Sequence, residues 1–498
     1  MMQKGAKRRR LIWTQDGPKM APRWLQDGKE YNVFVTSKTN KTSIMVHVFL
    51  SIAFLFGYSS SVQADNFEEA LRLGITNSNA LRESRQDYLS ARQELIIAGS
   101  DKDFYGRASI SQNQAFYERP NDGDDAYGSS TLSGAITFTK QLYNFGETKA
   151  KQDAAAISID IAKAGYSTAE QSVLISLIQS YLAVILSQEE VDLHQSNFER
   201  LTEQTNAEEL RVEAGVSTLA NLALATSKRS TSRSDLISAK AGYQTAVEEY
   251  ESLIGVLPEQ LATPKLPDLI PVKVQLSENL AYENHPNLFL ATATQRLAAI
   301  QQEILVKALG PSVDLSLSAK KQNTGGIAAS DGNELSANIS VSVPILVTPS
   351  TMAQTQKLIS DVMSAQYQRD EVKRSIGLAA RAGFRNHVAA KIQHKASTAE
   401  VEAYQLVVDA TKTEVEFGNK TFLDQLDSED DLKNAKLREL RASHSVLLTG
   451  YQLLQSIGAL TAQNLGVGDA LIPLEALEVP GPEVGSIISV LKYAQPEQ

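Results

Sequence analysis

The amino-acid sequence predicts an α+β membrane protein made of two internal repeats, each combining very long helices with two amphipathic strands. Three observations predict it: two long segments without proline, strands in which apolar and polar residues alternate, and similar segments that recur at nearly one spacing. Helices of this length exceed those of globular domains, and strands of this pattern have one apolar and one polar face.

The composition excludes several classes of protein. The 498 residues include no cysteine, which excludes disulfide frameworks, thiolate metal sites, a cysteine nucleophile and a lipidated N-terminal cysteine. The net charge of −10 argues against a nucleic-acid partner. Because no run of about 18 apolar residues occurs, we expect no ordinary membrane-spanning helix.

The N-terminal region predicts export. Residues 44–58 form an apolar core followed by small residues at 62–64, as in a secretory signal peptide. The basic cluster at 7–10 lies far upstream, so either the basic region is extended or translation starts at Met20 or Met45. A nucleic-acid interpretation of this cluster is the alternative. Without residues 1–64, which hold 10 of the 48 basic and 3 of the 58 acidic residues, the net charge is −17.

Two long stretches without proline indicate the positions of the long helices. None occurs between Pro120 and Pro258, or between Pro349 and Pro473. Because proline breaks helix interiors, these stretches are expected to hold long helices, at 147–211 and 351–416. At 1.5 Å per residue such a helix is a rod of about 100 Å.

Matching segments about 203 to 207 residues apart indicate an internal duplication. Each repeat is expected to contain a first helix, two strands, the long helix, a glycine turn and a second helix. First helices are predicted at 67–103 and 278–309, and second helices at 219–254 and 422–457.

The repeats divide the chain into four parts. They are an N-terminal extension with the signal peptide (1–64), a first repeat (65–270), a second repeat (271–465) and a C-terminal tail (466–498).

The strands are predicted from period-two alternation. Apolar residues take every second position from Leu335 to Ile345, with polar residues between most of them, and similar patterns cover 313–319 and 136–142. The loops expected at 118–128 and 322–333 are rich in Asp, Asn and Gly.

Strands of this kind need partners, because an isolated hairpin is marginal in water. The apolar face fits the lipid-facing outside of a barrel with a polar lumen, and four strands per chain close such a barrel only with further copies. The alternative is a half-buried sheet packed on helices in a soluble protein. The export signal, the duplication and the helix lengths favour the barrel.

At three segments the chain resembles the TolC-type outer-membrane efflux protein family. They are 141–148 (QLYNFGET), where strand passes into long helix, 211–218 (RVEAGVST), and 416–427 (EFGNKTFLDQLD), which matches the family's Gly-x-x-Thr-x-x-Asp-x-x-Asp turn. The likeness follows the family's order over 65–465. It departs from the family at Pro349, where the first repeat has Gly146.

The resemblance implies a homotrimer in the outer membrane of a Gram-negative cell. Three copies would form a trimeric 12-stranded β-barrel, four strands per chain, continued into the periplasm by a long α-helical barrel. It implies an export duct for efflux or type I secretion, surrounded by outer-membrane lipid. Its partners would be a periplasmic adaptor protein and an inner-membrane ABC or proton-driven transporter. It implies no enzyme activity, cofactor, metal or nucleic-acid partner, and it leaves the substrate open.

The segment 416–427 holds the candidate site. Gly418 is placed to end one helix, and Thr421 to cap the next with Asp424 in a capping-box pair. Asp424 and Asp427 lie three apart on one helix face, where acids in a first turn also simply favour the helix dipole. The resemblance implies that both aspartates line the periplasmic entrance. Six carboxylates from three copies would favour cations there, and crowding would raise some of their pKa values.

The first repeat lacks these acids. Ala220 and either Ala223 or Leu224 stand in their places, so one turn per chain is expected to carry the ring. Gly215 marks the corresponding turn, and Lys420 is a latch candidate that could pair with a neighbour.

Other polar and aromatic residues give weaker signals. Glu429, Asp430 and Asp431 are expected to form a solvated helix face, and His387 and His394 to lie on the surface. Aromatic residues near strand ends are either interfacial belts or ordinary strand residues: Tyr105, Phe116, Tyr117, Tyr127 and Tyr143.

Two other functions remain as alternatives. A periplasmic adaptor also uses long helical hairpins, but it has one hairpin and no paired strands before it. A non-channel coiled-coil surface protein would need sustained heptads and no alternating strands. No Walker loop, His-Glu-x-x-His or Gly-x-Ser-x-Gly motif is present, which weighs against an enzyme.

Overall fold

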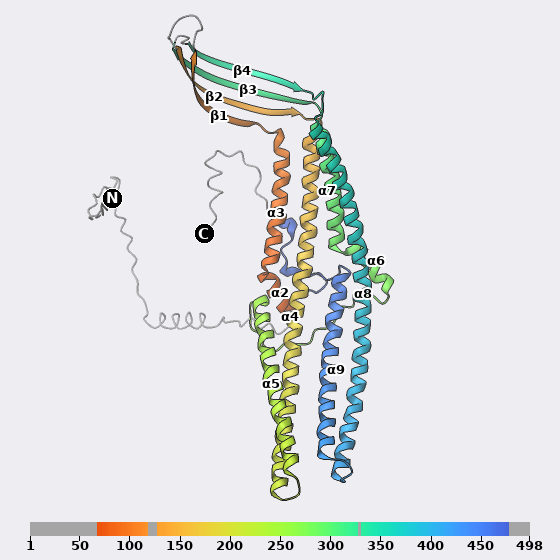
Figure 1. Cartoon of the computed structure of the whole chain (residues 1–498). Helices are drawn as coiled ribbons and strands as arrows, with labels where there is room; N and C mark the ends of the chain where they lie inside the picture. The colour runs from red at the N-terminus through yellow and green to blue at the C-terminus, as the bar shows by residue number, and fades with distance from the viewer. Residues whose placement is uncertain (1–66, 118–126, 327–329, 478–498) are drawn as a thin grey trace, which may run out of the picture. The chain divides into compact units, whose positions relative to one another are not determined.

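The computed structural model describes residues 67–117, 127–326 and 330–477. The predicted N-terminal extension and signal peptide, and the tail after residue 477, lie outside the described residues. Within the described part, two series of elements follow the same order: two short helices, two strands, a long helix and a final helix (Figure 1). The structure therefore confirms the predicted duplication.

The first series runs from α2 to α5 and the second from α6 to α9. Their elements are α2 (Phe67–Asn77), α3 (Asn79–Gly99), β1 (Tyr105–Tyr117), β2 (Tyr127–Tyr143), α4 (Glu147–Glu213), α5 (Leu219–Ile254), α6 (Val274–Asn284), α7 (Pro286–Ala308), β3 (Ser312–Gly326), β4 (Ser330–Ser342), α8 (Pro349–Glu416) and α9 (Phe422–Ser456). Short 3-10 helices follow α3 and lie near the C-terminal end of the described chain.

The long helices confirm the prediction from proline. Helix α4 has 67 residues and α8 has 68. Each packs along a second helix, α4 with α5 and α8 with α9, and so forms a hairpin (Figure 1). Helix α8 starts with Thr348 as its cap and Pro349 in the first turn, where the missing N–H of proline costs no hydrogen bond.

The first helices differ from the prediction, which placed one continuous helix at 67–103 and another at 278–309. Each is broken near its start. The side chain of Ser78 caps α3 by accepting from the Leu81 amide at 3.4 Å. In the second series His285 takes an extended conformation before Pro286, because the residue before proline disfavours the helical region. These local preferences outweighed the apolar periodicity.

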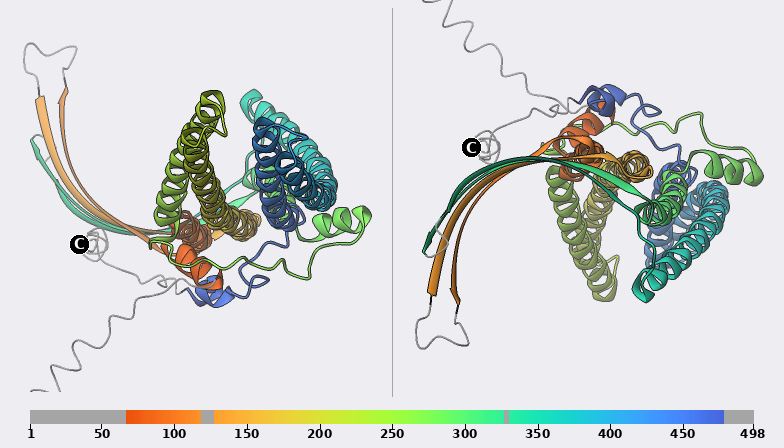
Figure 2. Two further views of the ribbon diagram at one scale, coloured as in Figure 1. Left: turned by 90° about the horizontal axis from the view of Figure 1, so that it is seen from below. Right: turned by 90° about the horizontal axis from the view of Figure 1, so that it is seen from above.

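The four strands form one curved antiparallel sheet in the order β1-β2-β3-β4 (Figure 2). Its register separates two faces. One row joins Gly106, Phe138, Leu317 and Ala337, whereas the adjacent row joins Arg107, Thr137, Ser318 and Ser336. In these rows the predicted apolar and polar faces continue across all four strands, whereas Lys140 and Lys321 interrupt the apolar face in other rows.

The observed ends of the strands differ from the predicted ends in two places. The strands run further into the predicted loops, so that β3 reaches Gly326 and β4 starts at Ser330. At its other end β4 stops at Ser342, although the alternation predicted a strand as far as Ile345. Strand β3 begins at Ser312, which pairs with Ser342, so β4 has no partner in its own chain beyond that point.

The main apolar core lies where α2, the middle of α4, and the ends of α5 and α9 meet. The rings of Phe67 and Tyr181 stack edge to face with their centroids 5.1 Å apart, and Tyr250 and Tyr451 are fully buried beside them. Helix α4 contains an apolar 18-residue window that passes a length and hydropathy test for a membrane span, but 61% of that window is buried, as expected for a core helix.

Residues 466–477 pack against the first series. Val467 and Leu474 are buried, and Arg72 pairs with Asp469. Lys163 on α4 pairs with Glu475 at 2.7 Å. This start of the tail therefore belongs to the folded unit.

Candidate functional site

Two glycine turns connect the helices of the hairpins. Gly215 follows α4 with φ 73°, and Gly418 follows α8 with φ 76°, both in the left-handed region. In each turn the glycine N–H and the next N–H bond back to carbonyls of the last helical turn, at 3.0 and 2.8 Å. This is a Schellman motif, which satisfies the end of a helix and needs a left-handed residue.

We expect Gly418→Ala to lower the free energy of unfolding by about 1 to 2 kcal/mol, because a side chain strains a left-handed backbone. Gly242 is the matched control, since it lies exposed inside α5 with open space around it. There alanine should be neutral or stabilise by about 0.5 to 1 kcal/mol. Denaturant unfolding followed by circular dichroism measures both. Equal stability of the two variants would contradict the assigned backbone strain.

Thr421 and Asp424 form the predicted capping box at the start of α9. The Thr421 hydroxyl accepts from the Asp424 amide at 3.2 Å, and the Asp424 carboxylate accepts from the Thr421 amide at 2.8 Å. The Thr421 hydroxyl also lies 2.6 Å from the Asp424 carboxylate, and this bond is the main reason that the pKa of Asp424 is lowered. Crowding among copies would act in the opposite direction.

Asp427 lies one turn further along α9 and binds a lysine. Lys228 of α5 reaches across to Asp427 at 3.2 Å and to Asp430 at 2.6 Å. Hydrogen bonding to Asp430, followed by that to Asp427, raises the pKa of Lys228. The Asp427 side chain is still 58% exposed. One of the two predicted aspartates therefore caps a helix, and the other is half of a bridge between hairpins.

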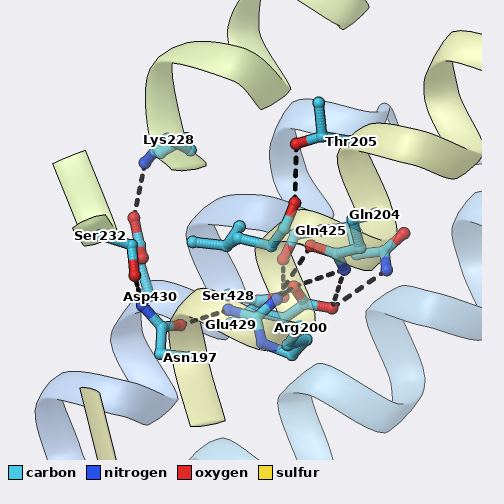
Figure 3. A network of polar contacts seen from close by, with 11 residues as sticks. Asn197, Arg200, Gln204, Thr205, Lys228, Ser232, Gln425, Ser428, Glu429 and Asp430 are labelled. Atoms are coloured by element: carbon cyan, nitrogen blue, oxygen red, sulfur yellow. Dashed lines mark hydrogen bonds and ion pairs between the residues drawn. The ribbon is translucent and has the colours of Figure 1, made fainter. Parts of the chain in front are cut away.

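Glu429 is the centre of a polar network between the two hairpins (Figure 3). Its carboxylate pairs with Arg200 of α4 and accepts from Gln204 at 2.8 Å. Gln425 of α9 donates to it at 3.0 Å. The Glu429 side chain is only 10% exposed.

A second step of this network reaches α5. Arg200 donates to Asn197 at 2.6 Å, and buried Asn197 donates to the buried hydroxyl of Ser232 at 2.9 Å. Charged and amide groups from α4, α5 and α9 thus form one connected set (Figure 3).

The prediction of a solvated face for Glu429, Asp430 and Asp431 is wrong for its first two members. Asp430 is half-buried against Lys228, and Glu429 faces α4, whereas Asp431 is exposed. Successive helical residues lie about 100° apart, so adjacent acids occupy different faces. Three consecutive acids in a sequence do not indicate which of them faces the other hairpin.

Further polar pairs continue along the same seam, away from the turns. Arg441 of α9 lies 2.7 Å from Glu190 of α4, and His444 lies 2.9 Å from Glu189. We call this series of pairs, from Lys228 and Arg200 to His444, the polar seam. It differs from the main apolar core because polar and charged side chains supply its contacts.

The surface position predicted for His387 is wrong. Its side chain is buried, and its Nδ1 lies 3.3 Å from the Thr449 hydroxyl. His394 is partly exposed, with Glu439 3.7 Å away. Burial lowers the pKa of His387, with a further contribution from nearby Lys391. A lone histidine on a helix carries no pattern that reveals such burial.

Lys420 binds within its own hairpin. Its Nζ lies 2.8 Å from Glu414 and 3.3 Å from the Thr411 hydroxyl. The equivalent turn of the first repeat uses Thr218 as a cap for the Asn221 amide at 3.2 Å and has no acidic pair. Besides Asp427, the hairpins are bridged by Lys228, Arg200 and Glu429, which sequence patterns did not identify because each lies in a different helix.

The comparison with known protein families decides the identity. The model of the outer membrane efflux protein family matches residues 75–256 and 279–459. The chain belongs to the outer membrane efflux protein family. The two matched segments fall on the two series of elements.

Relatives in the family are similar over most of the chain. The outer membrane efflux protein BepC of Brucella suis is 25% identical over 438 residues, covering 88% of this chain and 94% of BepC. The outer membrane protein TolC of Vibrio cholerae is 20% identical over 354 residues, covering 68% of this chain and 79% of TolC. The CmeC outer membrane channel of Campylobacter jejuni has a similar fold, with a TM-score of 0.67 at 13% identity over 81% of this chain and 88% of CmeC.

The efflux family is a family of channels, and its members include secretion proteins as well as efflux proteins. The chain is therefore an export channel of the outer membrane, as the resemblance implied. Its fold, a four-stranded sheet with long helical hairpins, agrees with the predicted α+β class.

Proposed function

We propose that three copies of this chain form one continuous conduit, in which the sheets close a 12-stranded barrel and the hairpins form a periplasmic tunnel. The observation that carries this proposal is the sheet itself. Strands β1 and β4 are both edges, and the apolar face includes Ile110, Leu335 and Ile339, which are 65% exposed or more. A sheet in contact with lipid cannot keep unpaired edge strands, because lipid offers no hydrogen-bond partners to their backbone groups. Such a sheet must therefore close into a barrel.

A stripe on α8 supports the same assembly. Met352, Met363, Tyr367 and Leu378 are each more than half exposed. At about 100° per residue they fall within about 80° of one another around the helix. A row of exposed apolar side chains on one helix face fits burial against a neighbouring copy.

The ends of the hairpins form the periplasmic entrance in this proposal, with Asp424 and Asp427 as its acidic ring. Both side chains are exposed, and Asp424 keeps its charge well into the acidic range because its pKa is lowered. The turn residues Gly215, Gly418 and Thr421 hold the tips in shape. Lys420 stays a latch candidate toward a neighbouring copy, although in the single chain it pairs with Glu414 of its own hairpin.

The contacts of the polar seam hold the two hairpins together and so keep the entrance closed. Opening requires the α8–α9 hairpin to move away from the α4–α5 hairpin. Separating charged pairs returns both partners to water, whereas separating an apolar core exposes surface with no compensation. The Glu429 network and the Lys228 bridges therefore hold a closed state that can be released.

The proposed partners are a periplasmic adaptor protein and an inner-membrane pump, which supplies the energy, so that the chain itself catalyses no reaction. Exposed apolar residues at both turns fit contact with an adaptor: Leu210, Val216, Leu219, Phe417 and Leu423. The adaptor and coiled-coil alternatives are disfavoured, because two equivalent hairpins follow paired strands in this chain.

Cell fractionation tests the proposed function. We expect the protein in the outer-membrane fraction as a trimer that dissociates on heating and conducts ions in planar bilayers. A soluble periplasmic monomer would refute the conduit.

A further inference from the structure

Lys321 lies at one border of the apolar face of the sheet. Successive side chains of a strand alternate between faces, so this face takes every second residue of β3. These residues are Val313, Leu315, Leu317, Ala319, Lys321, Asn323 and Gly325. The face is therefore apolar as far as Ala319 and polar from Lys321 onward. On β4, Asn333 pairs with Lys321 and adjoins Leu335 on the same face, so the border continues onto the next strand.

The apolar face is the outer side of the curved sheet (Figure 2). Four residues of this face on β3 are exposed: Leu317, Ala319, Lys321 and Asn323. The residues between them are half-buried: Ser318, Lys320 and Gln322. On the half-buried face the hydroxyls of Thr131 and Thr324 lie 3.2 Å apart, as expected where side chains converge inside a curve. Lys321 thus lies on the outer side and Lys320 on the inner side.

The position of Lys321 along the strand assigns it to one leaflet of the membrane. Helices α3, α4, α7 and α8 all join one end of the sheet (Figure 1). Strand β3 leaves that end at Ser312, and Lys321 is closer to the other end of the strand, at Gly326. Because the helices extend into the periplasm in the proposed conduit, Lys321 lies in the half of the sheet that meets the outer leaflet.

A hollow of about 660 Å³ lies beside Lys321 on the outer side of the sheet. Its apolar lining includes Ile110, Ile136 and Leu335. Gly134 pairs with Lys321 and contributes no side chain, and a Cβ built there would have no other atom within 4 Å apart from its chain neighbours. The hollow therefore joins apolar surface on its periplasmic side to a cationic group at its outer border.

Lys321 has no partner within its own chain. In the described ranges, no salt bridge or side-chain hydrogen bond involves Lys321. The other lysine of this face, Lys140, lies with its Nζ 4.7 Å from the centroid of the Phe104 ring. A lysine on the lipid side of a barrel is tolerated near the membrane surface, where its ammonium reaches the headgroups. For Lys321 the lipid must then supply the opposite charge.

The nearby acids lie too far along the strand or on the wrong face to neutralise Lys321. Asp331 is on the same face, but it pairs with Asn323, two residues nearer the loop. Glu334 pairs with Lys320 on the inner side. The outer border of the hollow therefore carries one free ammonium, and a single acid lies further from the apolar surface.

We propose that Lys321 and the hollow bind an anionic lipid of the outer leaflet, whose headgroup phosphate has no cationic group of its own beside it. The Lys321 ammonium pairs with the phosphate, and the Asn333 amide donates to a further headgroup oxygen. One acyl chain lies in the hollow against Ile136 and Leu335. This Lys321 site rests on the proposed barrel and names the class of lipid at one place on its surface.

The charge of the site discriminates between lipids. A zwitterionic headgroup carries an ammonium beside its phosphate, so Lys321 gains little by approaching it. With an anionic lipid nothing opposes the approach. One lysine near an anionic membrane surface contributes about fivefold to binding, and salt weakens this contribution. We therefore expect a preference of about fivefold for anionic lipid at the Lys321 site.

The fluorescence of one introduced tryptophan tests the Lys321 site. Both existing tryptophans, Trp13 and Trp24, lie in the N-terminal extension and are replaced by phenylalanine. Phe138→Trp then places a reporter on the outer side, in the row next to the hollow on its periplasmic side. The full chain is reconstituted in phosphatidylcholine vesicles that contain either brominated phosphatidylglycerol or brominated phosphatidylcholine. Brominated acyl chains quench a tryptophan that they touch, so the ratio of the two binding constants measures the preference.

We expect phosphatidylglycerol to bind beside the reporter about fivefold more strongly than phosphatidylcholine, and Lys321→Gln to bring this ratio to about one. Lys321→Arg keeps the charge and should keep the ratio. Lys320→Gln is the matched control, because it removes the same charge from the adjacent residue on the inner side, and it should leave the ratio unchanged. Asp331→Asn removes a repulsive charge and should raise the ratio. Gly134→Val fills the hollow and should lower the ratio although Lys321 is present.

A ratio of about one in the reporter chain with Lys321 intact would overturn the site. Equal losses in Lys320→Gln and Lys321→Gln would do the same, because they would assign the preference to total charge. Failure of the barrel gives a different result. If neither brominated lipid quenches the reporter at Phe138, the outer side of the sheet does not contact lipid, which counts against the proposed barrel itself.

Discussion

Glu429→Ala is expected to raise the open probability or mean conductance of the channel about tenfold in planar bilayers. The substitution leaves Arg200 and Gln204 without their acceptor and removes the central contact between α4 and α9. Hydrogen bonds to charged groups contribute about 1.5 to 3 kcal/mol, and partial exposure of Arg200 reduces this toward about 1.4 kcal/mol, or a factor of about ten.

Asp431→Ala is the matched control for this experiment. It removes the same charge from the same helix, but Asp431 is exposed and takes no part in the network. The exchange Arg200→Glu with Glu429→Arg should restore the closed state in part. If Glu429→Ala conducts like the unchanged protein, the polar seam does not close the entrance.

Replacing both acids of the proposed ring, Asp424→Ala with Asp427→Ala, is expected to raise single-channel conductance and to weaken block by multivalent cations by about tenfold or more. Six carboxylates around a narrow mouth attract and hold such cations, and the substitution removes all of them. It also removes the Lys228–Asp427 bridge of the polar seam, which favours the open entrance. Alanine also removes the Asp424 half of the capping box, so the variant with Asp424→Asn and Asp427→Asn separates loss of charge from loss of the cap.

A pair of acids elsewhere on the hairpin controls for total charge. Asp409→Asn with Glu402→Gln changes the charge equally at exposed positions of α8. We expect this control to keep both conductance and block. Unchanged conductance and block in the Asp424 and Asp427 variants would rule out their role as the ring.

Features set by neighbouring residues along the chain were predictable from the sequence. Helix α5 has the predicted bounds, and α4 and α8 differ from theirs by two residues at one end. The Gly418 turn and the Thr421 cap follow from side-chain chemistry within a few residues, and a sequence displays such chemistry directly.

Features set by distant residues were not predictable. Glu429 is largely buried because Arg200, more than 200 residues away in the sequence, lies opposite it, and nothing in the adjacent acids indicates this. Breaks at Ser78 and His285 depend on a local capping preference that outweighs continuous apolar periodicity. The predicted strand end at Ile345 differs from the structure of one chain because, in the proposed assembly, its partner strand belongs to another copy.

In the proposed assembly, three chains build one conduit through the outer membrane. Single-particle electron cryo-microscopy of the protein extracted from outer membranes tests it most directly. We expect a three-fold symmetric particle whose three four-stranded sheets close a single barrel above a helical tunnel. A particle of one or two chains, or a sheet that remains open at β1 and β4, would contradict it.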